Sequence, residues 1–152
     1  MQKFASAAGV EAFVGKEVGP GEWFTITQQA VDLFAQATGD HQWIHVDVER
    51  AKRDSPFGGP VAHGFLTLSL LPMLMAQCVA FDGAKAKVNY GLNRVRFTAP
   101  VLVGARVRLR ASLLQVETDP DRAMRLTWSV TIEIEGSGKP ACVAESLAKL
   151  HF

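Results

Sequence analysis

The chain has almost no net charge: 16 basic and 15 acidic residues leave +1 over 152 residues. That balance gives no electrostatic reason to expect a nucleic acid or an anionic membrane as a partner. The start of the chain lacks a basic segment followed by an apolar stretch, so we expect no secretory signal and a cytoplasmic location. Without an internal repeat or a linker, residues 1–152 are expected to form a single domain with a buried core.

Cysteine is scarce. Cys78 and Cys142 both lie in apolar runs, where a thiol behaves as a small buried hydrophobe. Two such residues make neither a disulfide framework nor a metal-binding pattern, and they fit a reducing compartment. The histidines at 41, 45 and 63 have no recognised metal-ligand spacing. We therefore expect no metal and no cofactor.

Charged residues are absent from Val61–Phe81. The stretch is long enough to span a bilayer by the usual criterion of about 20 residues. Gly64 and Pro72 interrupt it, however, and no cluster of Lys or Arg flanks it to set an orientation. We interpret it as one long helix buried inside a soluble domain. Because such a helix is apolar all round, it needs other structure wrapped round it.

The second half of the chain supplies a covering sheet. From Lys85 onward, apolar and polar residues alternate, most regularly over 106–113 and 124–135. One apolar face per strand is typical of an antiparallel sheet covered on one side. The alternation changes phase near Gly91–Arg94, which predicts a β-bulge. The sequence therefore predicts an α+β fold, with a curved antiparallel sheet wrapped round a long central helix.

The first half predicts shorter elements. Glu22–Ile26 is expected to be a strand, and the hydroxyl of Thr27 can cap a helix that runs to about Thr38. Gly39 ends this helix. Asp47 can cap another small helix over residues 48–53.

A polar loop between these two helices contains Asp40 and His45. A carboxylate and an imidazole five positions apart in a loop can converge on one water, activate it and shuttle its proton. Near Gly64, unpaired N–H groups at a helix start can hold a carbonyl oxygen that gains negative charge. Together these groups point to the addition or removal of water next to a carbonyl.

Structural roles for the same residues stay open. An Asp that follows a helix-ending Gly is often a turn residue, and a lone His is often a satisfied structural group. We expect His41 to face solvent or to be structural, and His63 to cap or pack at the helix start. Arg106, Arg108 and Arg110 are expected to form a solvated strand face.

Several motifs in the same order carry a family resemblance. Around the polar loop the matching residues are Phe34, Thr38, Gly39, Asp40, Ile44, His45 and Ala51. The likeness continues through residues 56–66, 89–97 and 99–101. On these residues the sequence resembles the MaoC-like dehydratase family, the (R)-specific enoyl-CoA hydratases with a hot-dog fold.

The resemblance implies a function and a site. Asp40 and His45 would be the catalytic pair for reversible syn addition of water to a trans-2-enoyl-CoA, giving an (R)-3-hydroxyacyl-CoA. Gly64 would offer its backbone N–H to the thioester oxygen, with Gln42 and His63 as candidate substrate-positioning residues. The substrate would be a thioester of coenzyme A or of acyl carrier protein. A homodimer joined edge to edge through its sheets is also implied.

Two positions depart from the common motif. Gln42 stands where the family usually has Asn, and it keeps the amide on a side chain one methylene longer. Trp43 replaces a Pro and cannot fix φ as proline does. A branch of the family that resembles nodulation protein N carries this form. At Pro72, some members have a serine instead.

Two alternative functions remain open. A hot-dog acyl-CoA thioesterase usually places a carboxylate on or near the central helix, which the uncharged stretch Val61–Phe81 argues against. A non-catalytic acyl-thioester binding protein would bind enoyl-CoA without turning it over. The intact Asp40/His45 pair argues against a pure binding protein, whereas Gln42 keeps that alternative open.

Overall fold

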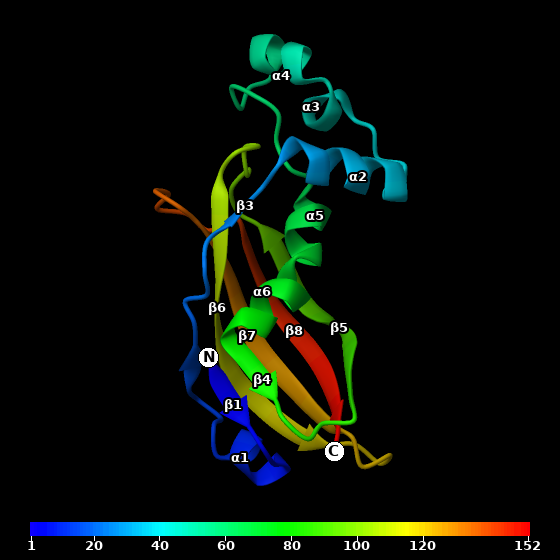
Figure 1. The fold of residues 1–152 in the computed structure, drawn as a ribbon, viewed down its shortest axis with the longest axis vertical. Coiled ribbons are helices and arrows are strands. Elements are labelled where there is room, and N and C mark those ends of the chain that lie inside the picture. The colour runs from blue at the N-terminus through cyan, green and yellow to red at the C-terminus, as the bar shows by residue number, and fades with distance from the viewer.

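Alternating apolar side chains build one curved antiparallel sheet. A computed structural model describes residues 1–152, and its main sheet has six strands (Figure 1). The strand order is β2 (Glu17–Val18), β6 (Arg106–Thr118), β7 (Met124–Ile134), β8 (Cys142–His151) and β5 (Ala86–Phe97), while β3 (Phe24–Thr25) also pairs with β6. The predicted α+β class with an antiparallel sheet is confirmed.

The inner face of this sheet is the core. Leu109 and Leu113 of β6 are fully buried, as are Leu126 and Ile132 of β7 and Leu150 of β8. They occupy the apolar positions of the alternating pattern, so the strand period of two directs them to one face. In β5 the register shifts twice, between Asn89 and Gly91 and between Leu92 and Arg94, which confirms the predicted bulge.

The uncharged central stretch is not one helix. It holds α5 (Gly64–Ser69) and α6 (Leu71–Cys78), with a break at Leu70. The prediction of a continuous helix over Val61–Phe81 is therefore wrong in its ends and its continuity. Pro72 explains the break, because it has no N–H to donate to the preceding turn and its ring clashes there.

The flanks of that stretch are extended. Val61 pairs with Leu102 in an isolated bridge. Val79–Phe81 forms β4, which lies parallel to β1 (Gln2–Phe4) in a separate two-stranded sheet, and α1 (Ala7–Glu11) follows β1. None of the helices is long and apolar enough to cross a membrane.

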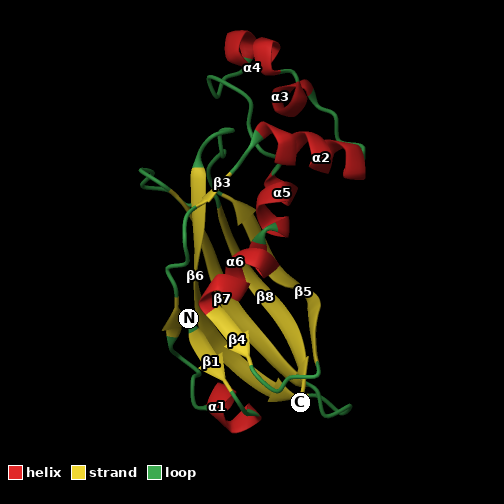
Figure 2. Ribbon diagram, in the orientation of Figure 1, coloured by secondary structure: helices red, strands yellow, loops and turns green.

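Three further helices gather beyond one end of the sheet (Figure 2). Thr27 caps α2 (Gln28–Thr38) by accepting from the N–H of Ala30, and Gly39 ends it in a left-handed conformation, as predicted. α3 (Trp43–Val46) and α4 (Val48–Asp54) follow, and Asp47 caps α4. The polar loop is thereby held between two well-defined helix ends.

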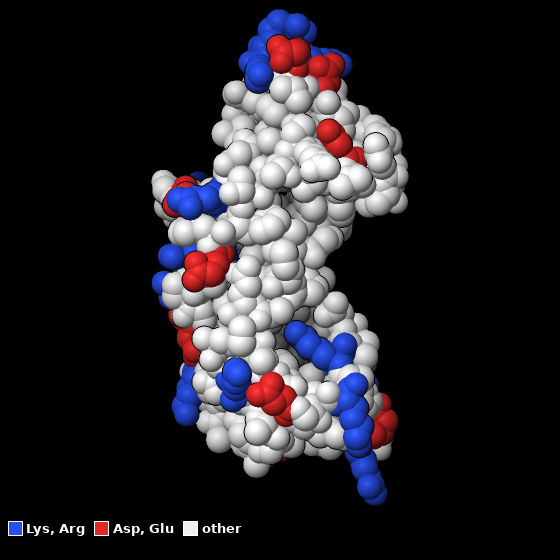
Figure 3. All heavy atoms as spheres, in the orientation of Figure 1, with Lys and Arg blue, Asp and Glu red and all other residues white.

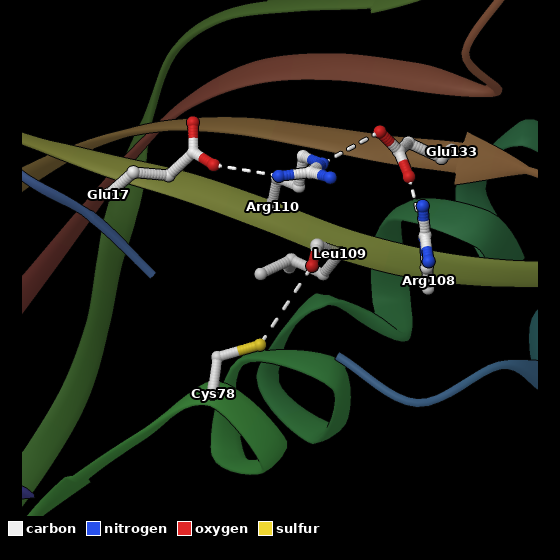
Figure 4. A network of polar contacts seen from close by, with 6 residues as sticks. All are labelled: Glu17, Cys78, Arg108, Leu109, Arg110 and Glu133. Carbon is white, nitrogen blue, oxygen red and sulfur yellow. Dashed lines mark hydrogen bonds and ion pairs between the residues drawn. The ribbon is translucent and has the colours of Figure 1, made fainter. Parts of the chain in front are cut away.

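The arginines of β6 do not simply face water. Arg110 contacts both Glu17 and Glu133, and Arg108 contacts Glu133 from the other side (Figure 4). Arg106 pairs with Glu135. Each of these partly exposed pairs stabilises the fold by about 0–1 kcal/mol. They therefore contribute little to the stability of the sheet and do not determine the fold. The acidic and basic side chains visible in Figure 3 lie mainly at the ends and edges of the molecule.

Gly39→Ala tests the turn that presents Asp40. Gly39 has φ of 79°, and nothing lies within 4 Å of a Cβ added there. Because only backbone strain opposes the new methyl group, we expect the free energy of unfolding to fall by about 1–2 kcal/mol. Urea denaturation measures it. Gly138→Ala is the control, since that loop position is equally open and lacks a positive φ. Equal losses at both positions would contradict the assigned role of Gly39.

Candidate active site

Three polar side chains meet where the helical end contacts the central segment. Asp40 comes from the loop after α2, His45 from α3, and His63 immediately precedes α5. One oxygen or nitrogen atom from each residue lies within 4.8 Å of the other two. The structure thus brings the sequence-predicted pair together and adds His63 to it.

His45 is fixed in one tautomer. Its ring is buried, and Nδ1 lies 2.6 Å from the carbonyl oxygen of Val61. Because a carbonyl can only accept, Nδ1 carries the proton in this bond and Nε2 keeps a free lone pair. The N–H of Val61 in turn donates to the carbonyl of Ile44 at 3.1 Å. The loop thus donates a hydrogen bond to the central segment through His45 and accepts one from it through Ile44.

Burial lowers the pKa of His45 below its ordinary value of 6.5. Hydrogen bonding to Val61 and the charge of Asp40 oppose this shift, whereas the neighbouring His63 adds to it. The net effect favours the neutral imidazole near pH 7, which is the form that accepts a proton.

His63 anchors the main chain of Asp40. It is 2% exposed, and its Nε2–H donates to the carbonyl oxygen of Asp40 at 2.9 Å. Its ring stacks on His45 with centroids 3.8 Å apart and planes at 26°. The expected side-chain cap is absent, so His63 packs rather than caps. Its Nδ1 is buried without a hydrogen-bond partner.

The stacking bears on metal binding. A metal ion lies in the plane of each imidazole that ligates it. In two nearly parallel stacked rings the in-plane lone pairs run parallel to each other and do not converge on one point. Asp40, His45 and His63 are thus close together, yet the two imidazoles are poorly arranged to ligate one ion. The absence of a metal stays a prediction.

Gln28 belongs to the site although its sequence position gives no such signal. Its side-chain amide donates to the carbonyl oxygen of His45 and to the carboxylate of Asp32, both at 2.8 Å. The first residue of α2 thereby holds the main chain of the histidine 17 residues later. Only the tertiary fold reveals this contact.

Asp40 fits both of its interpretations. Its Oδ1 accepts from the N–H of Gln42 at 3.3 Å, as a turn residue would, and its side chain remains exposed beside His45. The amide of Gln42 makes no hydrogen bond within the chain and is exposed, so its main chain rather than its side chain contacts Asp40. His41 faces solvent as expected.

Gly64 is the first residue of α5, where helical N–H groups have no intrahelical partner. A Cβ at this position would lie 2.8 Å from the ring of Phe97, so only glycine fits. Both residues line a pocket of about 330 Å³ with His45 and Thr67. Gly64 and His45 thus line one apolar pocket, whereas Asp40 and His63 lie outside its lining.

Comparisons with known proteins identify the family to which the chain belongs. The family model described as "MaoC like domain" matches residues 10–132. The chain is 55% identical over 149 residues to 3-hydroxyacyl-thioester dehydratase Z of Mycobacterium tuberculosis, covering 98% of each chain. It is 45% identical over 148 residues to nodulation protein N of Rhizobium leguminosarum, covering 97% of this chain and 92% of that one.

A solved structure is also similar. The (R)-hydratase from A. caviae involved in PHA biosynthesis has a TM-score of 0.72 and 25% identity, covering 90% of this chain and 96% of that chain. The predicted hot-dog fold is confirmed by this likeness and by the sheet around α5 and α6. On its sequence and its fold, the chain belongs to the MaoC-like dehydratase family.

Proposed function

We propose that this protein is an (R)-specific enoyl-CoA hydratase that adds water reversibly to a trans-2-enoyl-CoA. The observation that carries the proposal is that Asp40 lies close to His45, whose Nε2 is free, near the first turn of α5. Similarity to a 3-hydroxyacyl-thioester dehydratase and to an (R)-hydratase supports the reaction class and the configuration of the product.

The chemistry begins with the thioester carbonyl at the N–H of Gly64. Asp40 and His45 hold a water against C3, and Nε2 of His45 accepts its proton as the oxygen bonds to C3. The electron pair of the C2–C3 double bond moves toward the thioester oxygen, where the backbone donor stabilises the developing charge. The Asp40/His45 pair then returns a proton to C2, which completes the 3-hydroxyacyl thioester.

The fixed tautomer of His45 suits this cycle. The bond to Val61 keeps Nδ1 protonated, so the proton gained at Nε2 is the one that is later given up. Burial lowers the pKa of His45, which makes the imidazolium a readier acid for the second transfer. The same ring can therefore act as base and then as acid.

A homodimer fits the exposed edge of the sheet. β5 pairs only with β8, and it exposes Val88 and Tyr90, whose apolar surface a second copy would cover. Because an unpaired edge strand is a template for association, pairing of two β5 strands would join the sheets of two copies.

Asp40→Asn and His45→Gln test the pair. Each removes a proton-transfer group while keeping a polar side chain of similar size, so hydration of crotonyl-CoA should fall by at least about 10²–10⁴-fold. Loss of absorbance of the conjugated thioester measures the rate, and circular dichroism checks the fold. Wild-type rates in both folded variants would refute the assignment. A thiol reagent that detected CoA release would instead indicate a thioesterase.

The pH dependence follows from the lowered pKa of His45. The imidazole must be neutral to accept a proton, so kcat/KM should remain high at pH 6.5 and decline only at lower pH. The unfolded chain takes up this proton more readily than the folded one, so stability should also decrease as the pH falls below 6.5. Steady-state rates and thermal unfolding between pH 4.5 and 8 measure both. If kcat/KM already declined above pH 6.5 as the pH was lowered, the role of His45 as the base would be contradicted.

Gly64→Ala tests the backbone donor. The new methyl group would lie within 3 Å of Phe97 and displace either the ring or the helix start. We expect kcat to fall by about 10²-fold, because a stabilising donor moves away from the developing charge. Adding Phe97→Ala removes the clash, so the double variant should recover part of kcat. No loss of kcat in a folded Gly64→Ala variant would exclude this donor.

A further inference from the structure

The buried ring of His63 contacts two other rings. It stacks on His45 with centroids 3.8 Å apart, and Phe34 of α2 packs against it with centroids 5.0 Å apart and planes at 53°. Its main chain is held at the start of α5, where the N–H of Thr67 donates to the carbonyl of His63 at 3.1 Å. Residues of α2, α3 and α5 therefore all contribute to the position of this ring.

Only one nitrogen of His63 makes a hydrogen bond. Nε2–H donates to the carbonyl oxygen of Asp40 at 2.9 Å, whereas Nδ1 is buried without a partner. A buried polar atom without a hydrogen bond costs about 1–3 kcal/mol. A phenylalanine would fill the same space without that cost, so what the histidine adds to its ring is the one donor that it offers to Asp40.

The stacked ring also determines what surrounds His45. Burial is the largest cause of the lowered pKa of His45, and the charge of His63 is a smaller cause in the same direction. With their centroids 3.8 Å apart, the two rings leave no room for a water between them. The face of His45 that His63 covers is therefore dry, and a dry environment disfavours the imidazolium.

Few charged groups act on His45 from the surrounding elements. Asp40 of the polar loop opposes the lowering of its pKa, and α2 contacts it through the neutral amide of Gln28. The pocket that His45 lines contains no Asp, Glu, Lys or Arg. Charged side chains of α2 and α4 near the loop are engaged elsewhere, namely Asp32, Asp47 and Arg50. Packing around the ring is therefore the main control on its protonation.

Resting on the proposed function, we propose that His63 is a positioning residue with two separable tasks: its ring keeps water away from His45, and its Nε2–H holds the peptide of Asp40 in place. His63 itself exchanges no proton with the substrate. One side chain thus controls how readily the base takes up a proton and where its carboxylate partner stands.

His63→Gln and His63→Phe separate the two tasks. Glutamine places an amide N–H near the position of Nε2 but leaves the face of His45 open to water, so kcat should be largely kept while the pKa of His45 rises toward 6.5. Phenylalanine keeps a stacked ring but has no donor, so the pKa of His45 should stay below 6.5 while kcat falls about tenfold or more. His41→Gln is the matched control, because His41 is exposed in the same loop and should change neither quantity.

Two measurements report on the tasks. Steady-state hydration of crotonyl-CoA gives kcat and the pH at which kcat/KM declines, and NMR titration of the His45 ring gives its pKa without substrate. If His63 only fills space, both variants will lose kcat together and His45 will titrate alike in the two, which overturns the inference. A wild-type His45 that titrates at or above pH 6.5 overturns it as well, and this result needs no variant to fold.

Failure of the proposed function can be told apart from failure of this inference. If the wild type hydrates no enoyl-CoA, NMR titration still compares His45 in the two variants, and backbone nitrogen relaxation of residues 39–42 replaces kcat as the measure of the Asp40 anchor. Greater motion of this loop in His63→Phe than in His63→Gln supports the anchor. Equal motion in both variants excludes the anchor, and equal pKa values of His45 exclude the shielding.

Discussion

The hydrogen bond from the ring of His45 to the carbonyl of Val61 is the contact on which the site depends. It joins the polar loop to the residues just before α5, and the bond from Val61 N–H to Ile44 closes the same junction from the other side. Without it the imidazole could rotate or change tautomer, and the loop would lose its orientation toward Gly64. The His45 ring is buried, and an unpaired ring N–H would be costly there. The folded state therefore depends on the carbonyl of Val61 as its acceptor.

Main-chain anchoring extends around this junction. His63 holds the carbonyl of Asp40, and Gln28 holds that of His45. Each anchor fixes the peptide of a candidate catalytic residue and occupies neither the carboxylate of Asp40 nor Nε2 of His45. The loop is thus rigid in its backbone although Asp40 itself is exposed, which is the arrangement that positions groups before the reaction begins.

Much of this was visible in the sequence because local rules decide it. The alternation in β6 and β7, the cap at Thr27 and the turn at Gly39 depend on nearest neighbours, and the structure reproduces them. The pairing of Asp40 with His45 was suggested by spacing and by family likeness. By contrast, Gln28 and Phe97 act across contacts far apart in the chain, so no spacing could reveal them. The uncharged run predicts one continuous helix, and although Pro72 is visible in it, only the structure shows that the helix is broken there, at Leu70.

That break separates the central segment into two parts with different tasks. In α6, Leu74, Met75 and Cys78 are buried in the core, where they pack beneath the sheet. In α5, Leu66 and Thr67 are buried as well, whereas Phe65 and Ser69 are exposed and Gly64 lines the pocket. A continuous rigid helix would couple the orientation of its first turn to the packing of its last. Pro72 removes a hydrogen bond between the two parts, so the first turn of α5 is positioned by its own contacts, with Leu66 in the core and Gly64 against the ring of Phe97.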